Sequence, residues 1–332
     1  MERLAIRLAA SALLLALAGA ANAQTLKFST VGSPSDPDTV AMKDWEAYIE
    51  ENSDLEVDVF DSASLVEQGK QAQALARGTI DAAYMSPTWI AEKIPAWDIL
   101  ATPYLLTGPD HICAFQQSDL WPEMVDEVDE AMGIVLLEAA YQGTRTLNLR
   151  EQKDVKTPAD LSGMTLRVVP SPANILMGEA LGASPTPIPF KELYLALQTG
   201  TVDAQENPLT LIYSNKFHEV TEQIVNTNHK VLIQMPAFSK RNWEKLSEDQ
   251  KQVVRDGARR AADNYSKNVA MQEASLRKTM EEEGIVFTDP DIDAFRAAML
   301  ESFKGSDLAK GWKPGMFDTI AGMDIPAECN MD

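Results

Sequence analysis

Two successive runs of alternating strand and helix signals constrain the fold of this chain more than any other feature. The first run has strand-like segments at 26–30, 55–60 and 80–85, separated by helical patterns at 39–51 and 66–77. The pattern starts again after residue 130, with strand-like segments at 133–140, 164–169 and 202–205 and helical patterns at 172–181 and 190–198. Strands that alternate with helices assemble into sheets covered by helices. The sequence therefore predicts an α/β protein with two lobes, and its 332 residues provide about 150 for each core.

A long charged segment from Leu246 to Glu283 has a helical pattern and contains a single glycine, Gly257. We expect one interruption near that glycine. A helix of this length exceeds what one lobe core requires, so we expect it to brace both lobes.

The N-terminus carries the marks of an export signal. Arg3 and Arg7 provide positive charge, 8–20 is apolar, and Ala21-Asn22-Ala23 is an A-x-A cleavage site. A membrane anchor is the alternative, but the apolar run falls short of the ~20 residues that a spanning helix needs. We therefore expect residues 1–23 to be a cleaved signal peptide and the mature protein to reside in the periplasm.

Charge and cysteine content exclude several classes of protein. The chain has 29 Lys and Arg against 50 Asp and Glu, a net charge of −21, which argues against binding to nucleic acid or to anionic membranes. Two cysteines are too few for a disulfide scaffold or a four-ligand zinc site. In an oxidising compartment Cys113 and Cys329 can pair, or they can be two unrelated thiols, and the sequence leaves both possibilities open.

No motif for catalysis, cofactor binding or metal binding stands out. The chain lacks G-x-G-x-x-G, G-x-x-x-x-G-K-[ST], H-E-x-x-H and G-x-S-x-G. Its three histidines, His111, His218 and His229, have no metal-site spacing, and we expect His229 to be a hydrogen-bonded structural residue. With 50 acidic residues, carboxylate pairs are unspecific evidence for a glycosidase. We expect no cofactor, no metal and no enzymatic activity, with an exported hydrolase that uses a carboxylate pair as the alternative.

The segment Val202–Pro208, with the sequence V-D-A-Q-E-N-P, resembles the V-D-G-Q-E-N-P motif of the solute-binding proteins of TRAP transporters. Further blocks occur in the family's order, at 141–145, 157–164, 166–168, 182–187 and 192–199. The closest resemblance is to the sialic-acid and sugar-acid branch of this C4-dicarboxylate-type family. It implies a two-lobed periplasmic-binding-protein fold with hinge-crossing strands and a long bracing helix. We expect one lobe to comprise 24–144 and 233–272, and the other 145–232 and 273–332.

The resemblance also implies a binding site for a carboxylate. Arg167 would form the main salt bridge to the ligand, Asn207 would donate its amide to the same carboxylate, Arg145 would add a contact, and Phe190 would be an aromatic side chain in the cleft. A guanidinium suits this role because its planar fork matches two carboxylate oxygens and stays charged. The alternatives are ion pairs for the arginines, a turn-capping role for Asn207, and core packing for Phe190.

Three positions depart from the sialic-acid binders. Val31, Gln68 and Ser86 stand where those proteins have Asn, Asp and Glu, respectively. A buried polar group of the ligand that loses its hydrogen-bond partner costs ~1–3 kcal/mol of binding free energy. The resemblance then implies a smaller acid than sialic acid. Gln68, Ser86 and Tyr213 are candidates for the distal part of the pocket, and Trp89 is a weaker one that equally suits the lobe core.

The expected function is to capture a small organic acid by lobe closure and to deliver it to the membrane permease subunits of a TRAP transporter. The leading ligand is a uronate or another sugar acid, and the alternatives are a C4-dicarboxylate, a 2-oxo acid or a sulfonate. We expect a monomer that binds no nucleic acid. A binding protein that serves a receptor and a ligand-free envelope protein are further alternatives.

Overall fold

The structure is a computed structural model that describes residues 24–329, so the predicted signal peptide at 1–23 lies outside the described residues. The strands are β1 Thr25–Ser29, β2 Glu56–Phe60, β3 Ala82–Met85, β4 Ile134–Leu136, β5 Ala140–Leu149, β6 Thr165–Val168, β7 Ser184–Pro187, β8 Ala204–Asn207, β9 Gln223–Ser239 and β10 Val286–Thr288. The α-helices are α2 Pro37–Asn52, α3 Gln71–Arg77, α4 Pro87–Ala91, α5 Pro109–Gln117, α6 Leu120–Met132, α7 Pro172–Ala180, α8 Leu193–Gln198, α9 Leu209–Ser214, α10 Lys240–Trp243, α11 Glu248–Glu282, α12 Ile292–Lys304 and α13 Met316–Ala321. Three of the short 3₁₀ helices matter below: η1 Pro95–Ala101, η3 Phe190–Glu192 and η6 Ala327–Cys329.

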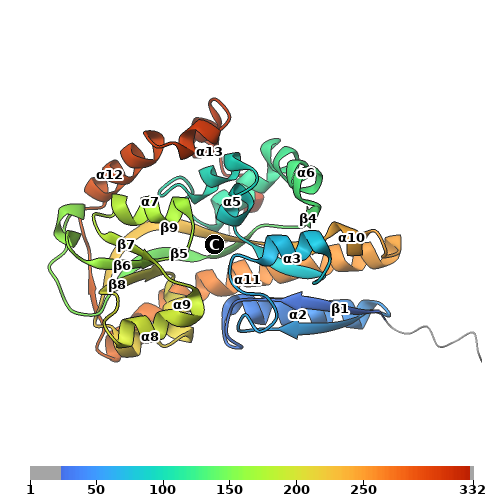
Figure 1. Cartoon of the computed structure of the whole chain (residues 1–332), viewed down its shortest axis with the longest axis horizontal. Coiled ribbons are helices and arrows are strands. Elements are labelled where there is room, and N and C mark those ends of the chain that lie inside the picture. The colour runs from blue at the N-terminus through green and yellow to red at the C-terminus, as the bar shows by residue number, and fades with distance from the viewer. Residues whose placement is uncertain (1–23, 330–332) are drawn as a thin grey trace, which may run out of the picture.

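Two long strands, β5 and β9, connect the two lobes. The sheet order is β2-β1-β3-β9-β5-β8-β6-β7, with β4 and β10 also paired to β9. The last residues of β9 pair with β3 and β4, whereas its earlier residues pair with β5 and β10. In Figure 1, β1, α2 and α3 lie on one side of the molecule and β6, β7, β8 and α7–α9 on the other. The expected two-lobed α/β fold with crossing strands is confirmed.

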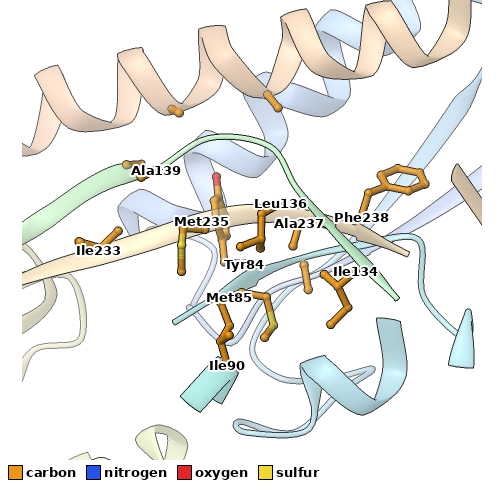
Figure 2. Close-up of a cluster of buried hydrophobic side chains, with 14 of the residues drawn as sticks. Tyr84, Met85, Ile90, Ile134, Leu136, Ala139, Ile233, Met235, Ala237 and Phe238 are labelled. Atoms are coloured by element: carbon orange, nitrogen blue, oxygen red, sulfur yellow. The ribbon is translucent and has the colours of Figure 1, made fainter. Parts of the chain in front are cut away.

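The first lobe is built around the parallel strands β1, β2 and β3, of which β3 is buried on both faces. All four residues of β3 are buried, as the near-continuous apolar sequence of a central parallel strand predicts. Figure 2 shows Tyr84 and Met85 of β3 beside Leu136 of β4 and Met235 of β9. These side chains close the core between the sheet and the helices that cover it.

Helix α2 begins at Pro37. Proline suits the first position of a helix, because the backbone N–H that it lacks would have no hydrogen-bond acceptor within the helix there. Its buried stripe contains Met42, Trp45 and Ile49, at the spacing of one helix face. Val40 on the same helix is 52 % exposed. Its position lies two residues before Met42, about 200° around the helix from it, so it faces away from the core.

The second lobe has two smaller apolar clusters. One includes Leu166 and Val168 of β6 with Phe295 and Met299 of α12. The other joins Leu193 of α8 and neighbouring residues to Met280, near the end of α11. Within residues 24–329, no helix is long and apolar enough to cross a membrane.

Helix α11 is continuous for 35 residues, so the expected interruption near Gly257 is wrong. The helix packs against α2 in the first lobe and α9 in the second, and Figure 1 shows it passing from one side of the molecule to the other. Gly257 lies under α2, where an added Cβ would be 2.9 Å from ring carbons of both Trp45 and Tyr48. The glycine therefore serves close helix packing instead of a break.

Replacing Gly257 by alanine is expected to destabilise the protein, although alanine is the better helix former by about 1 kcal/mol. The new methyl group must displace Trp45, which is fully buried and donates from Nε1 to the Val254 carbonyl at 2.9 Å. Such overpacking costs about 1–3 kcal/mol, so the net change is a loss of stability. Urea unfolding checks the sign, with Ser275→Ala on the exposed face of the same helix as the control. A stabilised Gly257→Ala variant would contradict this packing.

Cys113 of α5 and Cys329 of η6 form a disulfide, with their Cα atoms 5.5 Å apart. The segment that leads to Cys329 also packs on the first lobe, where Met316 and Ile320 belong to the apolar core. The residue boundaries that we assigned to the two lobes stay a prediction.

Reduction of the Cys113–Cys329 disulfide is expected to lower the free energy of unfolding by about 2–4 kcal/mol, because the bond closes a loop over a separation of 216 residues. Thermal unfolding with and without a reductant measures this effect. A Cys113→Ser/Cys329→Ser variant should match the reduced protein and show no further response to the reductant. A melting temperature that the reductant leaves unchanged would contradict the prediction.

Candidate functional site

A cavity lies at the carboxyl ends of the parallel strands, between the two lobes. Its walls include Thr30 and Val31 after β1, Ser86 after β3, and Val169 after β6. Ligand sites in open α/β sheets form at this edge, where the loops that follow neighbouring strands converge. Both lobes contribute, so a molecule in the cavity would contact both.

Arg167 on β6 is not itself a lining residue of the cavity but lies next to one, Phe190. Arg167 is fully buried, and its Nε donates to the Ile188 carbonyl at 2.8 Å. Within residues 24–329, neither Nη1 nor Nη2 has a hydrogen-bond partner. The guanidinium lies 5.8 Å from the ring centroid of Phe190, which lines the cavity.

Burial and the positive charge of Arg145 lower the pKa of Arg167 to about 9, although Glu206 acts in the opposite direction. A buried cation with two unused donors is costly unless an anion meets it. The geometry therefore suits a planar anion with two oxygens, such as a carboxylate.

Arg145 on β5 also lines the cavity, but its charge is already paired. Its Nε and Nη2 both donate to the carboxylate of Glu206 on β8, and Nη2 also donates to the Glu206 carbonyl at 2.6 Å. The structure thus shows the ion-pair alternative for Arg145 together with its place in the cavity wall.

Glu206 and His229 complete this buried cluster. Burial alone would raise the pKa of Glu206, but Arg145 and His229 hold it far below its usual range. His229 Nε2 lies 3.3 Å from Glu206, and Nδ1 lies 2.9 Å from Thr227 Oγ1. Burial lowers the pKa of His229. The imidazole is thus fully hydrogen-bonded inside the protein, the arrangement expected of a structural histidine.

Asn207 and Phe190 both line the cavity and also serve the protein's own structure. Asn207 ends β8, and its Nδ2 donates to Gln205 Oε1 at 2.6 Å. Phe190 begins η3, and its ring meets that of Phe217 edge-on at 5.7 Å. Both residues therefore line the cavity and also make contacts within the protein, and their binding roles stay predictions.

The first-lobe candidates Gln68, Ser86 and Trp89 line the cavity as well. Ser86 Oγ lies 3.2 Å from Thr88 Oγ1, which places two hydroxyl groups at the same wall. Trp89 is 6 % exposed and belongs to the first-lobe core, and its role in ligand binding stays a prediction.

Tyr213 is not brought to the cavity. Its hydroxyl donates to Glu283 at 3.2 Å, and its ring stacks on His218 at 4.6 Å, on another part of the surface. Leu211 on the same helix does line the cavity. Two residues correspond to about 200° of rotation around a helix, so Tyr213 faces away. Its assignment to the distal pocket is wrong.

Several polar residues of the cavity were missed by sequence reasoning, namely Asp36, Asp38, Asn174 and Lys230. Asp36 and Asp38 both lie in the turn-rich segment 33–38, where aspartate is typical of turns and helix caps. Burial, followed by the nearby Asp36, raises the pKa of Asp38 to about 7. The spacing of these aspartates beside an apolar strand was the signal that could have indicated a site.

Two sets of hydrogen bonds cross from one lobe to the other beside the cavity. The backbone N–H of Phe190 donates to Gln68 Oε1 at 2.8 Å. Ser214 Oγ and Asn215 Nδ2 donate to Asp36 Oδ1 at 2.6 and 2.7 Å, respectively. These contacts hold the second lobe against the first, so the structure corresponds to a closed arrangement of the lobes.

Groups of three or more His, Cys, Asp or Glu that could hold a metal ion are absent from residues 24–329.

Comparison with known proteins identifies the class to which this arrangement belongs. Residues 28–307 match the bacterial extracellular solute-binding protein family 7. The chain is 32 % identical over 287 residues to the sialic acid-binding periplasmic protein SiaP of Vibrio cholerae, with 86 % of this chain and 89 % of that protein covered.

Two crystal structures of TRAP periplasmic solute-binding proteins from Roseobacter denitrificans are similar over nearly their whole length. One, with bound 3-deoxy-D-manno-oct-2-ulosonic acid (KDO), has a TM-score of 0.88 at 35 % identity and covers 91 % of this chain and 100 % of its own. The other, with bound L-galactonate, has a TM-score of 0.82 at 26 % identity and covers 91 % of this chain and 99 % of its own. These proteins are transport components and not enzymes. The chain belongs to the bacterial extracellular solute-binding protein family 7, the periplasmic solute-binding proteins of TRAP transporters.

Proposed function

We propose that this protein captures a sugar acid, a monocarboxylate with several hydroxyl groups such as a uronate, an aldonate or an ulosonate. The observation that carries the proposal is the pair of buried, unpartnered nitrogens of Arg167. A ligand carboxylate would accept from both nitrogens and neutralise a buried charge beside the cavity. Asn207, Phe190 and Arg145 would complete this end of the site.

The opposite wall favours hydroxyl groups over a second carboxylate. Asp36 and Asp38 line the cavity from the first lobe, and a second ligand carboxylate beside them would meet like charge. Hydroxyl groups can instead donate to these carboxylates and to Gln68 and exchange hydrogen bonds with Ser86. The relatives named for sialic acid, KDO and L-galactonate all bind hydroxylated acids, which supports this class.

We further propose that the protein acts as a monomer, that residues 1–23 are removed on export, and that the closed form delivers its ligand to the membrane permease subunits. The lobes would move about β5, β9 and α11, with boundaries near 24–144 and 233–272 for the first lobe and 145–232 and 273–305 for the second. We assign 306–329 to the first lobe instead of the second, because Met316 and Ile320 pack in its core and Cys329 is bonded to it.

A ligand panel tests the proposal. The mature protein from Gln24 would be screened by thermal unfolding and calorimetry against KDO, L-galactonate, D-galacturonate, sialic acid, succinate, pyruvate and a sulfonate. A ligand at 100 times its Kd stabilises a protein by about 2.7 kcal/mol. We expect sugar acids to bind and succinate to bind far more weakly. If succinate, pyruvate or the sulfonate bound tightly and no sugar acid bound, the proposed ligand class would be wrong. Turnover of any compound would favour the hydrolase alternative.

A further inference from the structure

A second buried cation, Lys230 of β9, lies in the cavity wall. The residue is 6 % exposed, and its Nζ donates to Asn174 Oδ1 at 2.8 Å. Asn174 lies in the first turn of α7, is also buried, and lines the same cavity. An ammonium group has three donors, so one hydrogen bond leaves capacity on the cavity side.

The protein does not pair this charge. In the sheet, Lys230 is directly opposite Arg145 on the neighbouring strand, an arrangement that is unfavourable for like charges. Glu206, the nearest buried carboxylate of that cluster, is engaged by Arg145. Asp98 of η1 interacts with Lys230 electrostatically, but within the described chain Lys230 forms no ion pair.

Burial, followed by the charge of Arg145, lowers the pKa of Lys230 to about 8, while Glu206 and Asp98 act in the opposite direction. The lysine is therefore kept in the cavity wall at a cost to the folded state. A residue that is costly in the unliganded protein and that faces a binding cavity suggests a role in binding.

We infer that Lys230 and Asn174 form a subsite that binds one hydroxyl group of the sugar acid. This inference rests on the proposed function and specifies the substrate class further. A hydroxyl group both accepts and donates a hydrogen bond, so it matches an ammonium donor beside an amide oxygen. A second carboxylate matches less well, because it cannot donate to Asn174 Oδ1 and Asp98 already provides a negative charge nearby. The subsite therefore favours hydroxy acids over their deoxy counterparts.

A cycle of protein and ligand changes tests the subsite. L-galactonate and its series of singly deoxygenated analogues would be titrated by calorimetry into the wild-type protein and Lys230→Met. We expect Lys230→Met to bind L-galactonate about 10- to 100-fold more weakly, the range for a lost hydrogen bond to a charged group. One deoxy analogue should bind the wild type about as weakly, and Lys230→Met should lose no further affinity for that analogue.

Matched variants separate this role from others. Asn174→Ala, like Lys230→Met, should bind L-galactonate more weakly and should lose no further affinity for the same deoxy analogue. Lys230→Arg should keep part of the wild-type affinity for L-galactonate. Lys191→Met removes a positive charge from the partly exposed Lys191–Glu67 pair, next to Phe190, and should have little effect. Melting of the unliganded proteins checks folding: Lys230→Met should be at least as stable as the wild type, because it removes the repulsion with Arg145.

The pH dependence provides an independent readout. The groups that interact with Lys230 are Arg145 on β5, Glu206 on β8, Asp98 on η1, Asn174 on α7 and the adjacent His229 on β9. Binding favours the charged lysine, so affinity for L-galactonate should fall as the pH rises through the lysine pKa of about 8. Lys230→Arg retains its charge, so its affinity between pH 7 and 9 should fall less than that of the wild type.

Equal loss of affinity for L-galactonate and all deoxy analogues would show a general effect of charge and would overturn the subsite. Unchanged binding of L-galactonate by Lys230→Met would overturn it as well, while the proposed function stands. Failure of the wild type to bind L-galactonate, KDO or any other hydroxy acid of the panel would overturn the proposed function and this subsite together.

Discussion

Replacing Arg167 by methionine is expected to reduce affinity for a sugar acid by at least about 30-fold while leaving the unliganded protein as stable as before or more stable. The loss of binding follows from the removal of the two nitrogens that would hold the carboxylate, since breaking a buried charge pair typically costs about 2–5 kcal/mol. The free energy of unfolding should stay the same or rise, because the substitution removes a buried charge that has no ion-pair partner within the described residues. Calorimetric titration and urea unfolding measure the two effects separately.

Two further variants sharpen this test. Arg167→Lys keeps the positive charge but loses the planar fork, so its affinity should lie between those of the wild type and Arg167→Met. Arg259→Met removes an exposed arginine that pairs with Glu138, and it should leave binding unchanged. An Arg167→Met protein that binds sugar acids normally but unfolds easily would show that Arg167 has a structural role only.

Replacing Glu206 by glutamine is expected to lower the free energy of unfolding by about 3–5 kcal/mol at neutral pH. The carboxylate accepts both guanidinium hydrogen bonds of Arg145 and lies 3.3 Å from His229. Without it, Arg145 becomes an uncompensated buried charge near the equally buried cations Arg167 and Lys230. Breaking one partner of a buried ion pair has this magnitude because the remaining charge cannot regain its water.

The loss of stability caused by Glu206→Gln should also depend on pH. The pKa of Glu206 is lowered below its usual value of 4.5, so its contribution is present above that value and is lost as the pH falls through the lowered pKa. The stability difference between wild type and Glu206→Gln should therefore be largest at neutral pH and decrease in acid. Glu248→Gln, at an exposed pair with Lys251, should change nothing measurable. A Glu206→Gln protein as stable as the wild type at neutral pH would contradict the role of Glu206.

Much of the fold could be predicted from the sequence because local patterns and tertiary structure agree there. The apolar segment at 80–85 corresponds to β3, and the segment at 164–169 to β6. The crossing strands were expected only from the family resemblance, because β9 mixes polar and apolar residues without a clear alternation. The run at 133–140 was expected as one strand, but it contains β4 and the first residue of β5.

The family resemblance indicated Arg167, which lies beside the cavity, and its V-D-A-Q-E-N-P motif indicated Asn207, which lines the cavity; the binding roles of both stay predictions. Glu206 lies inside the same motif, yet no sequence pattern shows that its carboxylate faces Arg145 from a neighbouring strand. Lys230 was missed because β9 was not recognised as a strand, so the direction of its side chains was unknown. Tyr213 was assigned wrongly because the helical phase of the short α9 could not be established before the structure was known.

A crystal structure of the mature protein with L-galactonate or KDO bound would test the central claim most directly. The account predicts that the ligand carboxylate lies within hydrogen-bond distance of both Nη1 and Nη2 of Arg167, with hydroxyl groups toward the first lobe. A ligand whose carboxylate is held elsewhere, with both Arg167 nitrogens still without a partner, would contradict it.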